Sequence, residues 1–265
     1  MYKTKSEFSV DYSELMKEVL EKPSTVATCY SLFHNYSVNN QFLAYWQLKA
    51  NNIPISPINC LSGWNKLGRS VKKGQRAIYL WMPLGQSVRK VTDENGEEKI
   101  VSYFTRFGFK KRWFALSQTE GDKFEPEKAT LKDFDFSKVY DAFGITLVEF
   151  DKLNGNIQGY ANTKERTLAI NPIAQEPEMT ILHEVAHIVL NHSEVDYGTD
   201  LKELEAECTA YIIGSILGLP EEQLSHSRNY IQGWFKKDYI PEVNAKNIMR
   251  ASDKILNVGY NKVRK

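Results

Sequence analysis

The stretch Thr180-Ile-Leu-His-Glu-Val-Ala-His-Ile-Val-Leu-Asn-His192 contains the pattern His-Glu-x-x-His inside an otherwise apolar run. On a helix, His183 and His187 leave the same face one turn apart, with Glu184 beside them. The apolar residues cover nearly the whole circumference, which is typical of a buried helix. Buried ionisable side chains need partners, and a metal ion with a polarised water molecule would satisfy all three.

This spacing predicts a zinc site of the metallopeptidase kind, with His183 and His187 as ligands and Glu184 as the general base. Two histidines hydrogen-bonded in an ordinary core are the alternative. Because catalytic Zn²⁺ normally takes three protein ligands, we expect a third ligand downstream. A donor to a developing oxyanion is also expected, and the sequence does not choose among Tyr211, His226 and Tyr230.

Candidates for the third ligand are His192 and three glutamates that follow it in the chain. If the helix continued to His192, the side chain would lie roughly 500° around the axis from His187, off the ligand face. Among the glutamates, Glu205 lies on the side of its helix most continuous with the core, and Glu203 is expected to face water. We therefore predict Glu205 as the third ligand, with Glu207 as the alternative.

The composition is that of a globular protein, and 265 residues are enough for one large domain or two ordinary ones. The N-terminus lacks the apolar region of a secretion signal, and no apolar run is long enough to cross a bilayer. We therefore expect a cytoplasmic protein with no membrane contact. Cys29, Cys60 and Cys208 are odd in number and far apart, which predicts neither disulfide bonds nor a cysteine-bound metal.

Charge is divided unevenly along the chain. Residues 1–125 hold 18 Lys+Arg against 12 Asp+Glu, a net +6, whereas residues 126–265 hold 16 against 21, a net −5. Residues 64–112 alone carry 12 basic and 4 acidic residues, a one-sided patch that would attract anionic polymers. Aromatic residues are interleaved with these cations, and rings that stack on unpaired bases beside cations are typical of single-strand binding.

The predicted contacts to single-stranded DNA form two cationic clusters without acidic neighbours, together with one ring. They are Trp64, Arg69, Lys72, Lys73, Arg76, Lys110, Lys111 and Arg112. Burial in the core is the alternative for the aromatic residues of this segment, and it is the preferred prediction for those in the expected strands, Tyr79, Trp81, Trp113 and Phe114.

Hydrophobic periodicity and turn residues predict an α+β protein of two domains, residues 1–125 and 131–265. In the first domain we expect helices over residues 10–20 and 24–33 and from residue 39, followed by a hairpin of residues 77–91 and 99–116. In the second we expect strands over residues 146–150, 157–160 and 167–171, and helices over residues 136–143, 177–191, 201–217, 224–235 and 243–256.

Several motifs resemble known families. Residues 35–43 (Asn-Tyr-Ser-Val-Asn-Asn-Gln-Phe-Leu), 64–78 and 114–121 resemble the N-terminal domain of ArdC-type antirestriction proteins, which are carried by plasmids and other mobile elements. Residues 183–187 and 203–211 are similar to the zincin-type metallopeptidase domain that follows it, which is related to the ImmA/IrrE endopeptidases. The order and spacing of these motifs cover nearly the whole chain.

The resemblance implies that the first domain binds single-stranded DNA and that the second holds a gluzincin-like zinc peptidase site. It implies Glu205, which precedes Ala206, as the third ligand. The positions that match the family in the first domain are Asn40, Trp64, Arg69, Lys72 and Gly74.

The leading hypothesis is a zinc metallopeptidase coupled to single-stranded DNA binding. Antirestriction in the family need not depend on the peptidase site, so the rival hypothesis is a DNA-binding shield whose zinc is structural. A peptidase that cleaves a repressor is a third hypothesis. The intact motif favours an enzyme, because a structural site has no use for Glu184.

Overall fold

The computed structural model describes residues 9–92, 98–126, 134–152 and 156–261. In these residues the chain has the predicted α+β composition, and it divides into two compact units. One unit holds residues 1–42 and 127–265, and the other holds residues 43–126. The turn between the two hairpin strands was predicted at residues 93–98, and its residues 93–97 lie outside the described residues, as does the predicted start of the second domain at residue 131.

The two units differ from the predicted domains at one boundary, because the first helices group with the C-terminal part of the chain. Helices α1 (Tyr12–Leu20) and α2 (Thr25–Phe33) pack against the C-terminal helices α7 to α9. The amide of Gln232 donates to the carbonyl of Glu21 at 3.0 Å. Periodicity shows that such a helix has an apolar face, but it does not show which distant surface covers that face.

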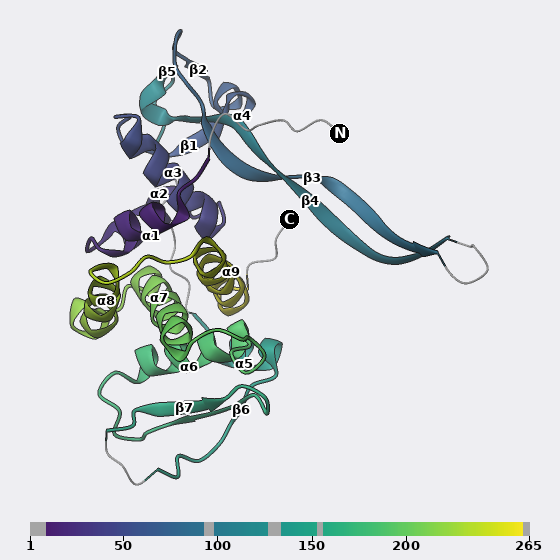
Figure 1. The fold of residues 1–265 in the computed structure, drawn as a ribbon. Helices are drawn as coiled ribbons and strands as arrows, with labels where there is room; N and C mark the ends of the chain where they lie inside the picture. Colours follow the sequence, from purple (N-terminus) through teal and green to yellow (C-terminus); the bar gives the residue numbers. More distant parts are fainter. Residues whose placement is uncertain (1–8, 93–97, 127–133, 153–155, 262–265) are drawn as a thin grey trace. The chain divides into compact units, whose positions relative to one another are not determined.

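A three-stranded sheet lies beneath the helix that carries the histidines. Its strands are β6 (Thr146–Leu147), β8 (Thr167–Ile170) and β7 (Gly159–Asn162) in that order, with β6 parallel and β7 antiparallel to β8. Helix α5 (Phe136–Phe143) precedes β6. Helix α6 (Pro177–Leu190) packs on β7 and β8 (Figure 1). Among the described strands, β7 is therefore an edge strand beside the histidines.

Three helices complete this unit: α7 (Thr199–Leu217), α8 (Glu221–Phe235) and α9 (Glu242–Gly259). Helix α7 packs against α6, α8 and α9, and its central turns are almost entirely buried. Its end is fixed by Gly218, whose φ of 75° is in the left-handed region that glycine adopts without strain. No helix in the described part of the chain is both long and apolar enough to cross a membrane.

The end of α6 decides where the next residues point. Pro177 occupies the first turn, where its missing N–H costs nothing. At the other end Asn191 has a φ of 58°, and its N–H bonds back to the carbonyls of His187 and Ile188. This left-handed residue stops the helix and reverses the chain. His192 therefore returns toward α6, with its N–H 3.2 Å from the carbonyl oxygen of His187.

The second unit contains most of α3 (Val38–Ala50) and two small antiparallel sheets. One sheet has the order β1-β4-β3, and the other pairs β2 with β5. The elements that follow α3 are β1 (Ile58–Cys60), α4 (Leu61–Lys66), β2 (Arg69–Val71), β3 (Ile78–Thr92), β4 (Glu98–Ala115), the 3₁₀ turn η1 (Leu116–Gln118) and β5 (Thr119–Gly121). The predicted hairpin is confirmed, with bounds that differ by about one residue.

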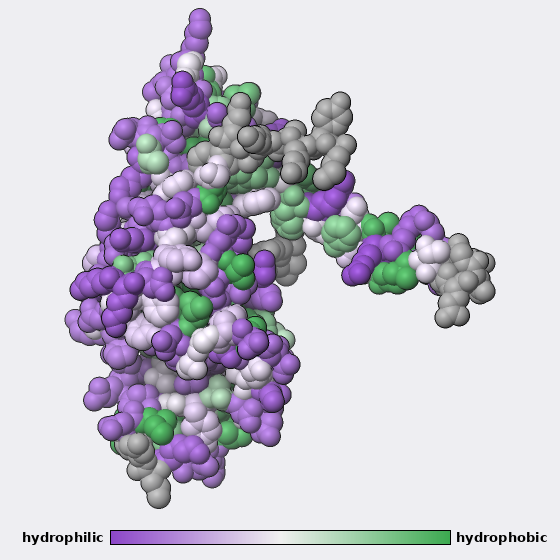
Figure 2. Space-filling view, in the orientation of Figure 1, coloured by the Kyte–Doolittle hydropathy of each residue, from purple (hydrophilic) through white to green (hydrophobic). Residues whose placement is uncertain are grey.

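The hairpin of β3 and β4 extends beyond its own sheet. Strand β1 pairs only with Trp113–Ala115 of β4, so the outer part of the hairpin is a two-stranded ribbon (Figure 1). Hydrophobic and hydrophilic residues are mixed along this ribbon (Figure 2). Its exposed large apolar residues are Leu84, Val88, Val91, Ile100, Val101, Tyr103, Phe104 and Phe107.

Trp64 is a core residue, which contradicts its prediction as a ring that contacts DNA. Only 1% of its surface is exposed, and its indole Nε1 donates to the carbonyl of Phe114 at 2.9 Å. Its ring meets that of Phe124 edge-on at 5.3 Å. Asn40, which the family resemblance suggested, is also buried. The sequence showed a tryptophan beside cations, but only packing decides whether such a ring faces solvent.

We expect Trp64→Ala to lower the free energy of unfolding by about 3–5 kcal/mol, because it opens a cavity and leaves the Phe114 carbonyl without its donor. Thermal unfolding of the full chain measures the change. Phe107→Ala is the matched control, because Phe107 is 56% exposed and its loss should change stability by about 0.5 kcal/mol or less. Equal shifts for the two variants would contradict the core assignment.

Candidate metal centre

Two imidazoles and one carboxylate converge between α6 and α7. His183 Nε2 and His187 Nε2 are 3.0 Å apart, and the Glu203 carboxylate oxygens lie 3.3 Å from the first and 3.6 Å from the second. In a tetrahedral zinc site with bonds of about 2.0–2.1 Å, ligand atoms stand about 3.3 Å apart. The three groups therefore fit a metal ion in both chemistry and spacing, and they form the one cluster of this kind among the described residues.

The position of Glu203 follows from the way in which the two helices pack. Helix α6 presents His183 and His187, four residues apart, and α7 presents Glu203 and Glu207, also four residues apart. Residues at this spacing share one helix face. Glu207 Oε1 lies 3.4 Å from His183 Nδ1, whereas Glu203 lies near Nε2 of the same ring. The two glutamates therefore contact the two nitrogens of one imidazole.

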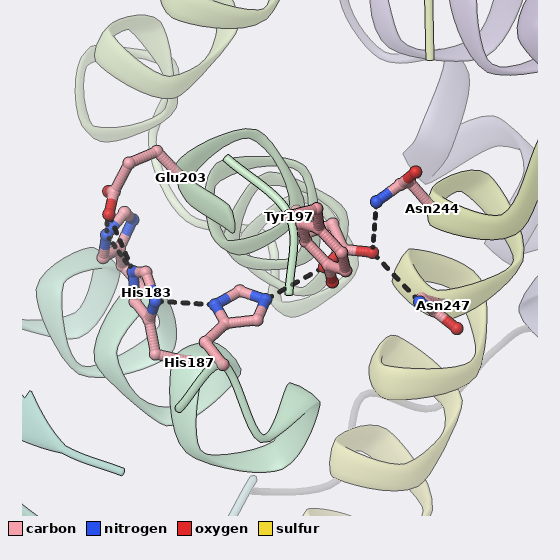
Figure 3. A network of polar contacts seen from close by, with 8 residues as sticks. His183, His187, Tyr197, Glu203, Asn244 and Asn247 are labelled. Carbon is pink, nitrogen blue, oxygen red and sulfur yellow. Dashed lines mark hydrogen bonds and ion pairs between the residues drawn. The ribbon is translucent and has the colours of Figure 1, made fainter. Parts of the chain in front are cut away.

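Glu205 lies outside this cluster, which contradicts the prediction that it is the third ligand. Figure 3 shows Glu203 beside His183, whereas Asn244 and Asn247, whose amides donate to Glu205, lie apart from them. It is completely buried, and its Oε2 accepts from His192 Nε2 at 2.9 Å and from the Tyr197 hydroxyl. Its Oε1 accepts from the amides of Asn244 and Asn247 at 3.1 and 3.2 Å. The prediction that Glu205 faces the core is correct, but the core side of α7 faces α9. Glu203, expected to face water, is 40% exposed and beside the histidines.

His192 is not part of the cluster of possible metal ligands, in agreement with the sequence analysis, which did not select it as a ligand. Its Nδ1 is 2.8 Å from His187 Nδ1, on the edge of the ring opposite Nε2. The sequence argument assumed that the helix continues to His192 and turns its side chain off the ligand face. In the structure α6 ends before His192, and the turn at Asn191 brings the His192 ring back toward His187. Burial lowers the pKa of His192 by more than the contact with Glu205 raises it. The lowered pKa favours the neutral imidazole.

Charges within the cluster compensate one another. Burial disfavours the charged form of His183, but contacts with Glu203 and Glu207 outweigh it and raise its pKa to about 10. The hydrogen bonds from His183 and His187 lower the pKa of Glu203 well below its usual range. For Glu207, burial raises the pKa, but the contacts with His183, Ser227 and His226 together lower it below its usual value. The carboxylates are thus held as anions beside the imidazoles, as a cation site requires.

Glu184 borders a cavity beside this cluster. Burial raises the pKa of its carboxyl group, against the attraction of His183 and His187, and the N–H of Ala161 in β7 donates to it. The cavity has a volume of about 400 Å³. It is lined by Ile157, Gln158, Gly159, Gln175, Glu176, Met179, Thr180, His183, Glu184, Glu207, His226 and Ser227.

The cavity distinguishes the three possible oxyanion donors. His226 is part of the lining. Tyr211 is buried within α7, with only 2% of its surface exposed. Tyr230 is partly exposed on α8, and burial followed by the charge of Glu203 raises its pKa. His226 is the one of the three that lines the same cavity as Glu184.

Sequence reasoning missed several residues of this site. Tyr197, Asn244 and Asn247 around Glu205 come from a loop and a helix that only the fold brings together. Glu207 was named as the alternative third ligand, but its place behind His183 was not predicted. Glu203 had a usable signal, because its four-residue spacing to Glu207 matches that of the two histidines.

The predicted DNA contacts other than Trp64 and Asn40 lie at the surface, in two places of the unit of residues 43–126. Arg69 is half-buried and occupied within its sheet, where its Nε donates to Thr119 Oγ1 at 2.9 Å. Lys72 Nζ donates to the carbonyl of Ser117 at 3.2 Å. The remaining predicted cations are exposed: Lys73, Arg76, Lys110, Lys111 and Arg112.

This arrangement, a helix with two histidines and a glutamate base beside a sheet edge, defines a metallopeptidase-like site. Residues 140–241 match the family model of the IrrE N-terminal-like domain, a peptidase family. The matched segment contains Glu184 and all three residues of the candidate metal cluster. The C-terminal part of the chain is therefore similar to these domains, as its sequence motifs indicated.

Two solved structures of the antirestriction ArdC protein from the R388 plasmid are similar over nearly the full length. The metal-free structure has 17% identity and a TM-score of 0.49, and covers 97% of this chain and 100% of its own. The Mn(II)-bound structure has 15% identity and a TM-score of 0.47, and covers 96% of this chain and 100% of its own. No curated protein matches the sequence significantly.

We expect about one divalent metal ion per chain in the purified protein, and Glu203→Gln should remove most of it, because an amide is a poor ligand beside two imidazoles. Elemental analysis after gel filtration measures the bound metal. Asp200→Asn is the matched control, since it removes an exposed charge one turn earlier on α7 and should leave the metal in place. Full metal retention in Glu203→Gln would show that the ligand set is a different one.

Proposed function

We propose that this protein is a zinc-dependent peptidase whose second unit binds single-stranded DNA. The observation that carries the peptidase assignment is the placement of the Glu184 carboxylate at a cavity beside His183, His187 and Glu203. Two imidazoles and one carboxylate match the ligand set of catalytic zinc sites, in which the fourth position stays open. A purely structural site would need neither a buried base nor a cavity.

The chain's own residues supply binding and proton transfer. When bound, zinc supplies Lewis acidity, which polarises a carbonyl group and makes water more acidic. Glu184 takes the proton from the attacking water, and its raised pKa suits it to pass that proton on to the leaving amine. The Ala161 N–H holds the Glu184 carboxylate in place, and His226 at the cavity wall donates to the developing oxyanion.

Strand β7 is suited to hold the substrate in an extended form. It pairs with β8 on one side, and the cavity begins at its first residue, Gly159. A peptide added along the free edge would form main-chain hydrogen bonds without regard to its sequence. A Cβ atom at Gly159 would come within 2.7 Å of Thr180 Cγ2, so the close approach of β7 and α6 requires glycine here.

We expect Glu184→Gln to keep the fold and the bound metal but to abolish hydrolysis, because the amide preserves the shape and cannot accept a proton. The measurement is cleavage of a mixed peptide library followed by mass spectrometry, with metal content determined on the same samples. Glu176→Gln, which also lines the cavity, is the control and should retain activity. Equal cleavage by Glu184→Gln and the unaltered protein would sink the general-base assignment.

The proposal of DNA binding rests on the face of the β3–β4 hairpin that carries Tyr103 and Phe107. Tyr103 and Phe107 are 69% and 56% exposed, and their spacing of four residues puts them on the same face of β4. Lys111 continues that face and lies over the Tyr79 ring at 5.4 Å. Exposed rings in line with cations suit stacking on unpaired bases and neutralising phosphates.

The biological role proposed for the two activities together is that of an antirestriction protein, and its support is the resemblance of the sequence motifs. A shield that binds DNA while its zinc only holds the fold together is the second candidate. The exposed hairpin favours DNA binding equally in both. Hydrolysis that depends on Glu184 would separate them, because the shield requires none.

We expect Tyr103→Ala and Phe107→Ala each to weaken binding of the full chain to a single-stranded oligonucleotide by about 1–3 kcal/mol, with little change in salt dependence. Phe104→Ala is the matched control, since Phe104 is equally aromatic and lies on the opposite face. Fluorescence anisotropy at several salt concentrations measures both quantities.

Replacing Lys110, Lys111 and Arg112 together by Ala should instead lower the slope of log affinity against log salt concentration by about 0.7 per lost phosphate contact. Unchanged affinity in all of these variants would remove the hairpin from the DNA proposal.

A further inference from the structure

We infer that His192 and Glu205 are positioning residues, which form a hydrogen-bonded relay that holds the proton of His187 on Nδ1 and keeps Nε2 available as a metal ligand. The inference rests on the proposed metal site and goes beyond it, because neither residue belongs to the ligand group of His183, His187 and Glu203. The relay runs from α7 through the turn after α6 to the second histidine of the motif (Figure 3).

The geometry of the relay is continuous. Glu205 Oε2 lies 2.9 Å from His192 Nε2, and His192 Nδ1 lies 2.8 Å from His187 Nδ1. The opposite nitrogen of His187, Nε2, faces His183 and Glu203. Both ring nitrogens of His187 and both of His192 therefore have a partner. Neither ring can flip without breaking two contacts.

The direction of each hydrogen bond follows from the carboxylate. The Glu205 carboxylate oxygens accept, as their contacts with the Asn244 and Asn247 amides show, so His192 Nε2 is the donor to Oε2. A neutral imidazole has one donor and one acceptor, which makes His192 Nδ1 the acceptor. His187 Nδ1 must then donate to it, and the lone pair of His187 Nε2 stays directed at the ligand group. The opposite tautomer of His187 would aim an N–H at the metal position.

The surroundings of Glu205 hold the start of the relay in place. Besides His192, the Tyr197 hydroxyl and the amides of Asn244 and Asn247 donate to its carboxylate. Four donors match the roughly four lone-pair sites of a carboxylate. They come from the loop before α7 and from α9, so the orientation of His187 depends on residues outside the metal cluster.

The two ligand histidines are thus supported differently by the same helix. Glu207 faces His183 Nδ1 directly, at 3.4 Å. For His187 the supporting carboxylate, Glu205, lies on the far side of α7, and His192 bridges the distance. Carboxylates behind ligand histidines fix ring orientation and raise ligand basicity. The three glutamates of α7 therefore act as ligand, as direct support and as support through a second histidine.

The test compares two substitutions of His192 that differ only in hydrogen bonding. His192→Gln can accept from His187 Nδ1–H through its oxygen and donate to Glu205 through its nitrogen, whereas His192→Leu can do neither. We expect His192→Leu to weaken zinc affinity about 10–100-fold, measured by competition with a chelator, and His192→Gln to stay within a few-fold of the unaltered protein. Ser252→Ala, which removes a buried hydroxyl of α9 outside the relay, should leave the affinity unchanged.

Equal zinc affinity in His192→Leu and the unaltered protein would overturn the relay while leaving the metal site intact. A loss of affinity in His192→Gln as large as that in His192→Leu would likewise reduce His192 to a packing role. A second measurement does not depend on any variant folding: ¹⁵N-detected NMR of the metal-free chain reports the tautomer of His187. A proton on Nδ1 supports the relay, and a proton on Nε2 overturns it. Failure of the unaltered protein to bind zinc would instead count against the proposed function.

Discussion

The packing of α6 against α7 is the contact on which the rest of the site depends. Each helix contributes a pair of ionisable residues four apart, two histidines on one side and two glutamates on the other. Two acidic groups alone would repel each other at the edge of a core, and two imidazoles alone would leave their ring nitrogens without partners. Facing each other, the pairs compensate their charges and leave room for one cation. The helix interface and the metal site are therefore the same structural feature.

Burial separates the two kinds of glutamate on α7. Glu205 is fully enclosed, and four donors occupy its carboxylate, so it has no capacity left for a metal. Glu203 is 40% exposed, and its carboxylate lies beside two imidazoles that a cation would itself bind. A ligand needs an unsatisfied lone pair at an accessible place, whereas a structural carboxylate needs the reverse. Full burial is thus evidence against the ligand role that it first suggested.

The hairpin of β3 and β4 differs from the metal site, because its apolar side chains are exposed instead of buried. Two-stranded ribbons gain little stability by themselves, and apolar side chains exposed along one are costly in water. The rings of Tyr103 and Phe107 are mostly exposed and so add little to the stability of the fold, which leaves them accessible for the DNA contact that we propose. Trp64, in the same unit, shows the contrast: its ring is enclosed and its N–H is satisfied, as in a core.

The sequence by itself determined the local structure and the central motif. Periodicity and turn residues predicted the hairpin and the helices other than the short α4 to within a few residues, because these depend on neighbours in the chain. The spacing of His183 and His187 requires only one helix, and so it was readable directly. Only the tertiary structure decided that Glu203 joins them, that the left-handed Asn191 returns His192 to α6, and that α1 and α2 group with the C-terminal helices. Each of these depends on which face of one element meets another, and a helix with polar residues on two faces does not encode that choice locally.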